Sequence, residues 1–275
     1  MLTFVANAIA FFRRQRSFKF NFNEKDMEYT LTANNPEQDE NELRQPVILL
    51  HGLFGNLSNW KAVQDVFSAD YNLYTPLLPL FDTVLGRNRL DRLVVFLEKY
   101  ILDHNIQNPI LIGNSLGGHV ALLYTLKHPD KVSKLVLTGS SGLYENSFGG
   151  GFPRVKDYNY IRKKVEDVFD RKEVVNAEVV DSVYSIVQNN SKVIAVISLA
   201  RDAQRQNLKD RLAEIKIPVL LIWGLQDIVT PPEVAREFHT LIPHSKLHLI
   251  DECGHVPMME QPILFNQYLK VFLSK

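Results

Sequence analysis

The most informative part of the chain is Pro109-Ile-Leu-Ile-Gly-Asn-Ser-Leu-Gly-Gly-His-Val-Ala-Leu-Leu-Tyr124. Its apolar run Ile110–Ile112 predicts a short buried strand, and the residues from Val120 onward predict a helix. Between the two, Ser115 occupies a Gly-x-Ser-x-Gly turn. Such a strained strand-to-helix turn exposes the serine, and the following helix points free N–H groups at its oxygen. We therefore expect Ser115 to act as a nucleophile.

Composition limits the kinds of partner. The chain has 275 residues with 31 basic and 31 acidic side chains, which fits one large α/β domain with an insertion. The balanced charge gives no general attraction to nucleic acid. Cys253 is the only cysteine, so we expect no disulfide or cysteine metal cluster and a cytoplasmic location. No apolar run reaches the roughly 18 residues that a membrane span needs.

Short apolar runs alternate with helical patterns along the chain. Continuous apolar runs are typical of strands that are buried on both faces of a parallel sheet. Alternation with helices predicts an α/β domain in which helices flank a mostly parallel central sheet. The predicted strands are Val47–Leu50, Tyr71–Tyr74, Ile110–Ile112, Leu135–Leu137, Val219–Ile222 and Leu247–Ile250.

The alternation breaks between residues 141 and 212, where three helical patterns follow one another without a convincing strand. We interpret 141–212 as a helical cap over one end of the sheet, with residues 18–140 and 213–275 as the core. The three glycines at 149–151 are either a hinge for the cap or only a loop.

The chain begins with an apolar and basic segment, residues 1–17, and a predicted hairpin follows over residues 18–32. The basic residues come after the apolar run, the reverse of a secretory signal. We favour a short helix packed on the domain or on a partner. The alternatives are a helix on a membrane surface, a helix at the substrate entrance, and a cleaved or disordered leader.

A serine nucleophile needs a base and an orienting acid, and in this type of fold they follow the serine in the order acid, then histidine. Asp227 follows the strand ending at Ile222, and His255 follows the strand ending at Ile250. Both positions lie just beyond the carboxyl ends of strands, the edge where open α/β sheets bind ligands. We therefore expect Asp227 to orient His255, and His255 to act as the base.

Other residues compete for these roles less well. His51 reads better as a loop-shaping partner of Gly52 than as a base, and His119 as a structural residue at the start of a helix. Asp251 and Glu252 lie on the same loop as His255, and we expect both to be solvated. Cys253 is interpreted as a small buried side chain.

Acyl transfer also requires donors for the developing oxyanion. The N–H of Leu116, directly after the serine, is one candidate, and the N–H of Leu53, after the Val47–Leu50 strand, is the other. Phe54 and Val256 adjoin Leu53 and His255, so we expect their side chains in the substrate pocket.

From about Phe18 to its end, the chain resembles serine hydrolases of the α/β-hydrolase fold that carry a helical cap. The resemblance implies the roles given above to Ser115, Asp227 and His255, with no metal and no organic cofactor. A serine in the nucleophile position sets the chain apart from the relatives that use aspartate there. The motifs are His51-Gly52, Gly113-Asn-Ser-Leu-Gly-Gly118, Trp223-Gly-x-x-Asp227 and Cys253-Gly-His255, followed by Glu260-x-Pro262.

Within that family, two groups compete. Gly-Asn-Ser-Leu-Gly-Gly and Cys-Gly-His resemble meta-cleavage-product hydrolases, which cut C–C bonds in vinylogous diketones. Those enzymes usually carry a Gly-Pro-Gly-rich run where this chain has Leu53–Leu57, and several carry an aromatic residue where it has Val256. Carboxylesterases resemble the chain better there, so we expect a small-molecule ester or similar acyl substrate.

Three further possibilities remain at the level of sequence. Arg201 or Arg205, in the predicted cap, is a candidate partner for a substrate carboxylate, although a solvated helix face is the simpler interpretation. The acyl group could also pass to an alcohol or thiol acceptor rather than to water. A non-catalytic ligand receptor on the same fold is the alternative from another functional class.

Overall fold

The computed structural model describes residues 44–55, 57–81, 89–146 and 154–274, with the side chains of Leu57 and Ser58 left out. The chain divides into two units, residues 1–44 and residues 45–275, and all the described helices and strands belong to the second. The predicted N-terminal segment, the hairpin over residues 18–32 and the glycines at 149–151 lie outside the described residues.

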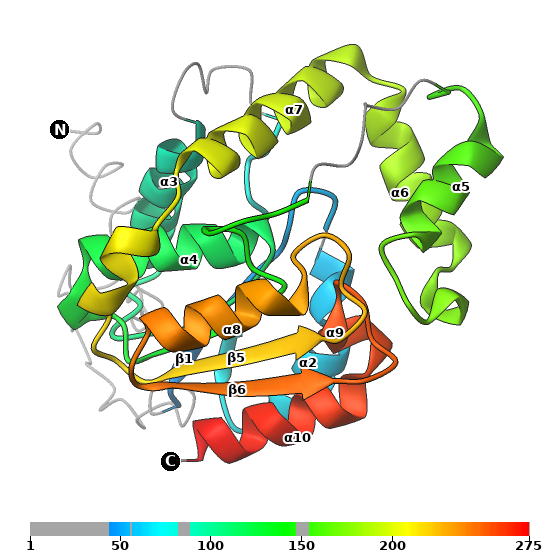
Figure 1. The fold of residues 1–275 in the computed structure, drawn as a ribbon. Helices are drawn as coiled ribbons and strands as arrows, with labels where there is room; N and C mark the ends of the chain where they lie inside the picture. Colours follow the sequence, from blue (N-terminus) through cyan, green and yellow to red (C-terminus); the bar gives the residue numbers. More distant parts are fainter. Residues whose placement is uncertain (1–43, 56, 82–88, 147–153, 275) are drawn as a thin grey trace, which may run out of the picture. The chain divides into compact units, whose positions relative to one another are not determined.

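A parallel sheet of six strands forms the centre of this unit, in the order β2-β1-β3-β4-β5-β6. Figure 1 labels β1, β5 and β6 of this sheet. All six strands predicted between Val47 and Ile250 are present, most of them one to two residues longer than expected. The parallel α/β architecture predicted from the alternation is therefore confirmed. The strands are β1 Pro46–Leu50, β2 Asn72–Tyr74, β3 Ile110–Asn114, β4 Lys134–Thr138, β5 Val219–Gly224 and β6 Ser245–Ile250.

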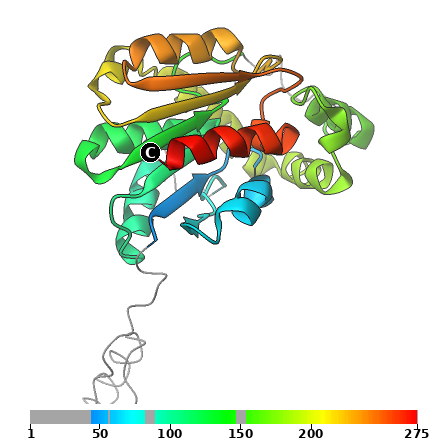
Figure 2. The ribbon, with the colours of Figure 1, turned by 90° about the horizontal axis from the view of Figure 1, so that it is seen from below.

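The sheet is covered by helices on both faces, because successive side chains of a strand point to opposite sides. Ile48 and Leu50 of β1 belong to one apolar cluster, with α3, α4 and α8. Val47 and Leu49 belong to the other, with α2 and α10; Figure 2 shows α10 lying along this second face. The flanking helices are α2 Lys61–Phe67, α3 Arg89–Asp103, α4 Leu116–Lys127, α8 Pro232–Leu241, α9 Pro257–Glu260 and α10 Pro262–Leu273.

Single residues in the sequence predict two helix boundaries: Pro129 predicts the end of the helix that follows Ser115, and Ser58 predicts the N-cap of a helix that runs to about Phe67. The helix α4 ends at Lys127, as expected from Pro129, which disfavours a helical His128. The prediction of Ser58 as the N-cap of α2 was wrong, since the α-helix begins only at Lys61. Residues Leu57–Trp60 wind as a tighter 3₁₀ turn, which buries Trp60 completely before the α-helix starts.

Three helices occupy the span predicted as a cap: α5 Tyr158–Glu166, α6 Ala177–Val187 and α7 Asn190–Arg205. Each begins at a residue whose side-chain oxygen accepts a hydrogen bond from a backbone N–H three residues later, which explains the starting points. Residues 154–212 contain no strand. The capping pairs are Asp157 with Tyr160 N (3.1 Å), Asn176 with Val179 N (3.0 Å) and Asn189 with Lys192 N (3.1 Å).

Short 3₁₀ turns complete the described chain: η2 Leu57–Trp60, η4 Pro129–Lys131, η5 Lys172–Val174 and η6 Lys209–Glu214. None of the helices among the described residues is long and apolar enough to cross a membrane.

Candidate active site

Ser115 forms the sharp corner between β3 and α4. Its backbone lies at φ 54° and ψ −121°, a region that costs a non-glycine residue about 1–3 kcal/mol. Its N–H donates to Thr138 O at 3.1 Å, which pins the corner to the end of the neighbouring strand β4. Ser115 is partly exposed although its neighbours on both sides are buried. The corner therefore presents the hydroxyl to the edge of the sheet.

Asp227 lies in the turn after β5 and is almost fully buried, at 3 % exposed. Its Oδ1 accepts hydrogen bonds from Val229 N (2.8 Å) and Thr230 N (3.0 Å), and its Oδ2 accepts one from Thr230 Oγ1 (2.9 Å). These three donors fix the carboxylate rigidly and stabilise its negative charge in a buried position.

The partner of Asp227 is His255, whose Nδ1 lies 2.9 Å from Oδ2 and 3.1 Å from Oδ1. A carboxylate at Nδ1 holds the proton there, so Nε2 is the nitrogen left to accept a proton. Burial lowers the pKa of His255, but the charge and hydrogen bond of Asp227, helped by Glu145 and Glu260, outweigh burial and raise the pKa above 6.5. The pair has the arrangement of a histidine base and its orienting acid.

The loop that carries His255 has to pass over the end of β5, because β4 and β5 separate β6 from β3. The crossing occurs at Gly224, where an added Cβ would lie 2.2 Å from the carbonyl oxygens of Cys253 and Gly254. Gly139, at φ 51° after β4, lies against the imidazole: a Cβ there would be 2.9 Å from His255 Nδ1. Only glycine leaves room for the loop at these two positions.

Asn114 links the serine corner to the histidine, a role that the sequence analysis missed. Its Nδ2 donates to Thr138 O at 3.0 Å and to His255 O at 3.1 Å, and the side chain is 3 % exposed. Ser115 and His255 thus lie at the same edge of the sheet, although no hydrogen bond joins their side chains in this structure. Catalytic hydrogen bonds are often long without substrate. The only signal in the sequence was the place of Asn114 inside the motif.

The competing histidines have structural roles. His51 Nδ1 lies 2.8 Å from Gly52 O, and its Nε2 accepts from Leu78 N at 3.0 Å, so both ring nitrogens are occupied by backbone. Burial lowers the pKa of His51 and, more strongly, lowers the pKa of His119 to about 4. Both therefore remain neutral, and neither takes part in the Asp227–His255 pair.

The other competing groups lie where the sequence analysis expected them. Cys253 is fully buried, and burial raises the pKa of its thiol, which makes it a poor nucleophile. Asp251 and Glu252 are exposed, and Asp251 accepts a hydrogen bond from Gln226 at 2.8 Å. None of the three contacts the imidazole of His255 through a hydrogen bond.

The predicted oxyanion donors lie on both sides of Ser115. Leu116 is the first residue of α4, so its N–H belongs to the unpaired N-terminal turn of that helix. Leu53 lies in a turn closed by Gly55 N donating to Gly52 O at 3.1 Å. A Cβ on Gly52 would lie 3.0 Å from Ser115 Cβ, which places this turn against the serine.

The two predicted pocket residues pack on the same apolar cluster. Val256 is buried within the cluster that contains α2 and α10, and Phe54 is half-buried against it. Arg201 and Arg205, the predicted carboxylate partners, are both exposed on α7. Their positions agree with a solvated helix face.

Glu145 is a second residue that the sequence analysis missed. It is half-buried on the segment after β4, and its carboxylate interacts electrostatically with His255. The next residue, Asn146, anchors this segment to the Asp227 loop: its N–H donates to Val229 O at 2.7 Å and its Nδ2 to Ile228 O at 2.8 Å. Burial raises the pKa of the Glu145 carboxyl. Among the described residues, no cation forms an ion pair with it.

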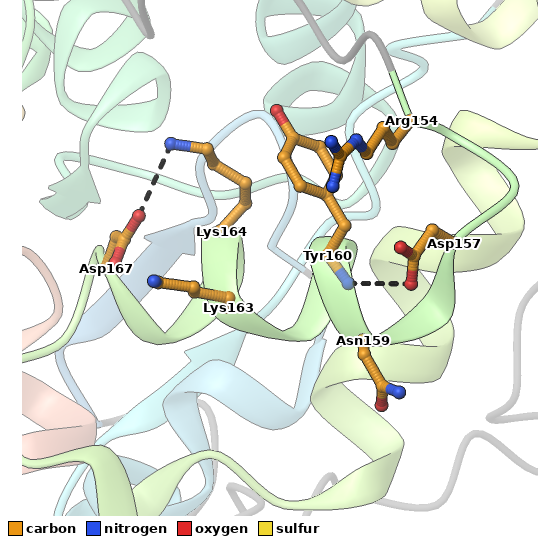
Figure 3. Close-up of a pocket in the computed structure, with 7 residues that line it drawn as sticks. All are labelled: Arg154, Asp157, Asn159, Tyr160, Lys163, Lys164 and Asp167. Carbon is orange, nitrogen blue, oxygen red and sulfur yellow. Dashed lines mark hydrogen bonds and ion pairs between the residues drawn. The ribbon is translucent and has the colours of Figure 1, made fainter.

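A hollow of about 420 Å³ lies away from these residues, along α5 (Figure 3). No predicted site residue lines it. Its charges largely cancel, and Lys164 pairs with Asp167 at 3.4 Å. In the part of the chain that the structure describes, no group of three or more His, Cys, Asp or Glu side chains is arranged to hold a metal ion. The lining residues are Arg154, Asp157, Asn159, Tyr160, Lys163, Lys164 and Asp167.

Comparison with known proteins identifies similar chains. Residues 45–262 match the family described as alpha/beta hydrolase fold. The uncharacterized hydrolase YugF of Bacillus subtilis (strain 168) is 26% identical over 258 residues, covering 86% of this chain and 93% of its own. The 2-hydroxy-6-oxononadienedioate/2-hydroxy-6-oxononatrienedioate hydrolase of Escherichia coli (strain K12) is 27% identical over 253 residues. That match covers 84% of this chain and 88% of the hydrolase.

A solved structure is more similar in sequence. It is MGS-MChE2, an alpha/beta hydrolase enzyme from the metagenome of sediments from the lagoon of Mar Chica, Morocco. That chain is 37% identical, with a TM-score of 0.68, and the match covers 84% of this chain and 91% of the other.

Proposed function

Because the chain belongs to the alpha/beta hydrolase fold family and is a hydrolase, we propose that it cleaves a carboxylic ester or a similar acyl substrate through Ser115, His255 and Asp227. The observation that carries the proposal is the buried His255–Asp227 pair, with Nδ1 2.9 Å from Oδ2, at the sheet edge that also presents Ser115. A histidine held in this way leaves Nε2 able to activate a serine hydroxyl.

In the first half of the reaction, Ser115 Oγ attacks the ester carbonyl while His255 Nε2 takes the hydroxyl proton. Asp227 stabilises the imidazolium that results. The N–H groups of Leu53 and Leu116 hold the oxyanion, and the loss of one such donor typically costs about 10²–10³ in kcat. The C–O bond to the alcohol then breaks, His255 returns the proton to the leaving oxygen, and an acyl-enzyme remains.

In the second half, water attacks the acyl-enzyme carbonyl and gives its proton to His255 Nε2. The tetrahedral intermediate collapses, the bond to Ser115 Oγ breaks, and the proton returns to Ser115. The products are a carboxylic acid and free enzyme. The proposal requires no metal and no organic cofactor.

Glu145 favours an ester whose acyl and alcohol parts carry no negative charge. Its half-buried carboxylate interacts with His255 and forms no ion pair among the described residues. A substrate carboxylate brought to the same site would meet a like charge in a poorly solvated place. This feature weighs against a dicarboxylate dienoate.

The second candidate function is C–C bond hydrolysis of meta-cleavage-type diketones by the same residues. The observation that favours it is the 27% identity to the dienedioate hydrolase of Escherichia coli. A non-catalytic receptor is the third candidate, and the complete set of serine, histidine and aspartate weighs against it.

The test compares kcat/KM for p-nitrophenyl butyrate with kcat/KM for a meta-cleavage dienoate, in the parent and in Ser115→Ala. We expect ester cleavage that falls by about 10⁴- to 10⁶-fold in the variant. Preference for the dienoate would replace the ester proposal with the C–C hydrolase. Equal activity of Ser115→Ala and parent would refute the role of Ser115, and absence of labelling by a fluorophosphonate probe would favour the receptor.

A further inference from the structure

Glu260, the last residue of α9, is a buried carboxylate that the proposed reaction does not use. It is 1 % exposed, and no Lys, Arg or His forms a salt bridge with it in the described part of the chain. A buried charge is costly unless hydrogen bonds compensate it. Its partners therefore explain why it is retained in the core.

Four backbone N–H groups supply that compensation. Oε2 accepts from Asp170 N at 2.8 Å, Gly254 N at 3.0 Å and Arg171 N at 3.1 Å, and Oε1 accepts from Val256 N at 3.2 Å. Every partner is a donor, so an ionised carboxylate, which only accepts, matches all of them. An amide would point an NH₂ group at one or more of these donors.

The four donors come from two segments that are far apart in the sequence. Asp170 and Arg171 follow α5 in the predicted cap, whereas Gly254 and Val256 flank His255 on both sides. The segments also touch directly, because His255 N donates to Val168 O at 3.1 Å. The backbone of the histidine is thus held between Glu260 and residues 168–171.

We propose that Glu260 is a positioning residue that fixes His255 against the segment 168–171 and so couples the predicted cap to the base. The proposal rests on the function proposed above, since it assumes that His255 is the base. A displacement of a reacting group by about 1 Å can cost about 10²-fold in rate, so a loosened loop should reduce turnover.

The charge of Glu260 gives the proposal a second, independent readout. Burial lowers the pKa of His255, and Asp227, Glu145 and Glu260 together raise it. The described charged groups that act on His255 are these three carboxylates. If Glu260 only held the loop together, its loss would change the stability of the protein and leave the pH profile unchanged. Because its charge also raises the pKa of His255, its loss should in addition lower the pH at which His255 becomes neutral.

The first experiment measures the pH profiles of kcat and kcat/KM for p-nitrophenyl butyrate in Glu260→Gln, with Glu252→Gln as control. Glu252 lies on the same loop with an exposed side chain. We expect kcat to fall about 10- to 100-fold in Glu260→Gln with little change in KM. We also expect the acid limb of the pH profiles of Glu260→Gln to move to lower pH. The control Glu252→Gln should have the kcat, the KM and the pH profiles of the parent. A folded Glu260→Gln with parental kcat and acid limb would overturn the proposal.

A second pair of variants tests the proposal in case Glu260→Gln does not fold. One of the two removes the hydrogen bond from Arg171 N, in the predicted cap, to Glu260. Arg171→Pro deletes the backbone N–H that donates to Glu260, whereas Arg171→Ala keeps this N–H. Both variants lose the ion pair between Arg171 and Glu173, so this loss cancels in the comparison. Arg171 has φ −85°, close to the range of proline. We expect kcat to fall several-fold in Arg171→Pro relative to Arg171→Ala. Equal kcat in the two folded variants would overturn the coupling.

Ser115→Ala separates this proposal from the proposed function. If Ser115→Ala is inactive while Glu260→Gln equals the parent, only the positioning role fails. If Ser115→Ala is as active as the parent, the function fails and the role of Glu260 fails with it.

Discussion

The serine corner and the histidine loop are held in different ways. Ser115 lies between β3 and α4, and its backbone is held by this strand and helix together with the hydrogen bond from its N–H to Thr138 O of β4. His255 lies on a loop that depends on contacts with β5, with the segment after β4, with residues 168–171 and with Glu260. The proposed nucleophile is therefore positioned mainly by the strand and helix next to it in the sequence, and the proposed base by long-range packing.

This difference predicts an asymmetry in mutational sensitivity. Substitutions far from His255 in the sequence should impair the base while the serine corner stays intact. The hydrogen bond from Asn114 to His255 O is the described exception, since it connects the two regions directly. The following variants test the asymmetry.

The largest effect is expected from Gly224→Ala. The new methyl group would lie 2.2 Å from the carbonyl oxygens of Cys253 and Gly254, so the His255 loop has to shift. We expect kcat/KM to fall by about 10²-fold. Hydrogen exchange should rise in residues 251–256 and stay unchanged in β3.

The control for Gly224→Ala is Leu225→Ala, at the neighbouring residue, whose side chain is exposed. Leu225→Ala should keep the kcat/KM and the hydrogen-exchange rates of the parent. Increased exchange in β3 of Gly224→Ala would contradict a locally held serine corner.

An intermediate effect is expected from Thr230→Val, which removes one of the three donors to Asp227 with almost no change in shape. A hydrogen bond to a charged group contributes about 1.5–3 kcal/mol. We expect a fall in kcat/KM of about 10-fold, equivalent to about 1.4 kcal/mol. Thr240→Val, on the exposed side of α8, is the matched control. A parental rate for Thr230→Val would show that the two backbone donors suffice.

The smallest effect is expected from Glu145→Gln. His255 has to be neutral to accept a proton, so activity falls as the pH drops through its raised pKa. Removing the Glu145 charge lowers that pKa, and the acid limb of kcat/KM should move to lower pH. Activity on a substrate that carries a carboxylate should rise relative to p-nitrophenyl butyrate.

Glu178→Gln, at an exposed position of α6, serves as the control for Glu145→Gln and should leave both measurements unchanged. An acid limb that does not move in Glu145→Gln would mean that the Glu145 charge does not reach His255.

Much of the fold could be predicted because its signals are local. Four of the six strands, β1, β3, β4 and β5, contain continuous apolar runs, and the helices carry apolar residues at helical spacing, so most elements can be recognised within a few residues. The start of α2 could not be predicted in this way. Ser58 is a good capping residue, but it lies inside a 3₁₀ turn that ends at the fully buried Trp60, and the α-helix begins only after that turn. Asn114 and Glu260 were missed as site residues because the partners that reveal their roles include groups 24 to 141 positions away. Glu145 was missed for the same reason, since it acts on the distant His255.

The sequence by itself determined the alternation of strands and helices, the serine corner, and the candidates Asp227 and His255, since each depends on a short motif and its order in the chain. Only the tertiary structure decided that Asp227 bonds His255, that Gly224 lets the loop cross β5, and that Glu260 joins two distant segments. The physical reason is that hydrogen bonds and close packing act between neighbours in space, and a sequence orders residues only along the chain.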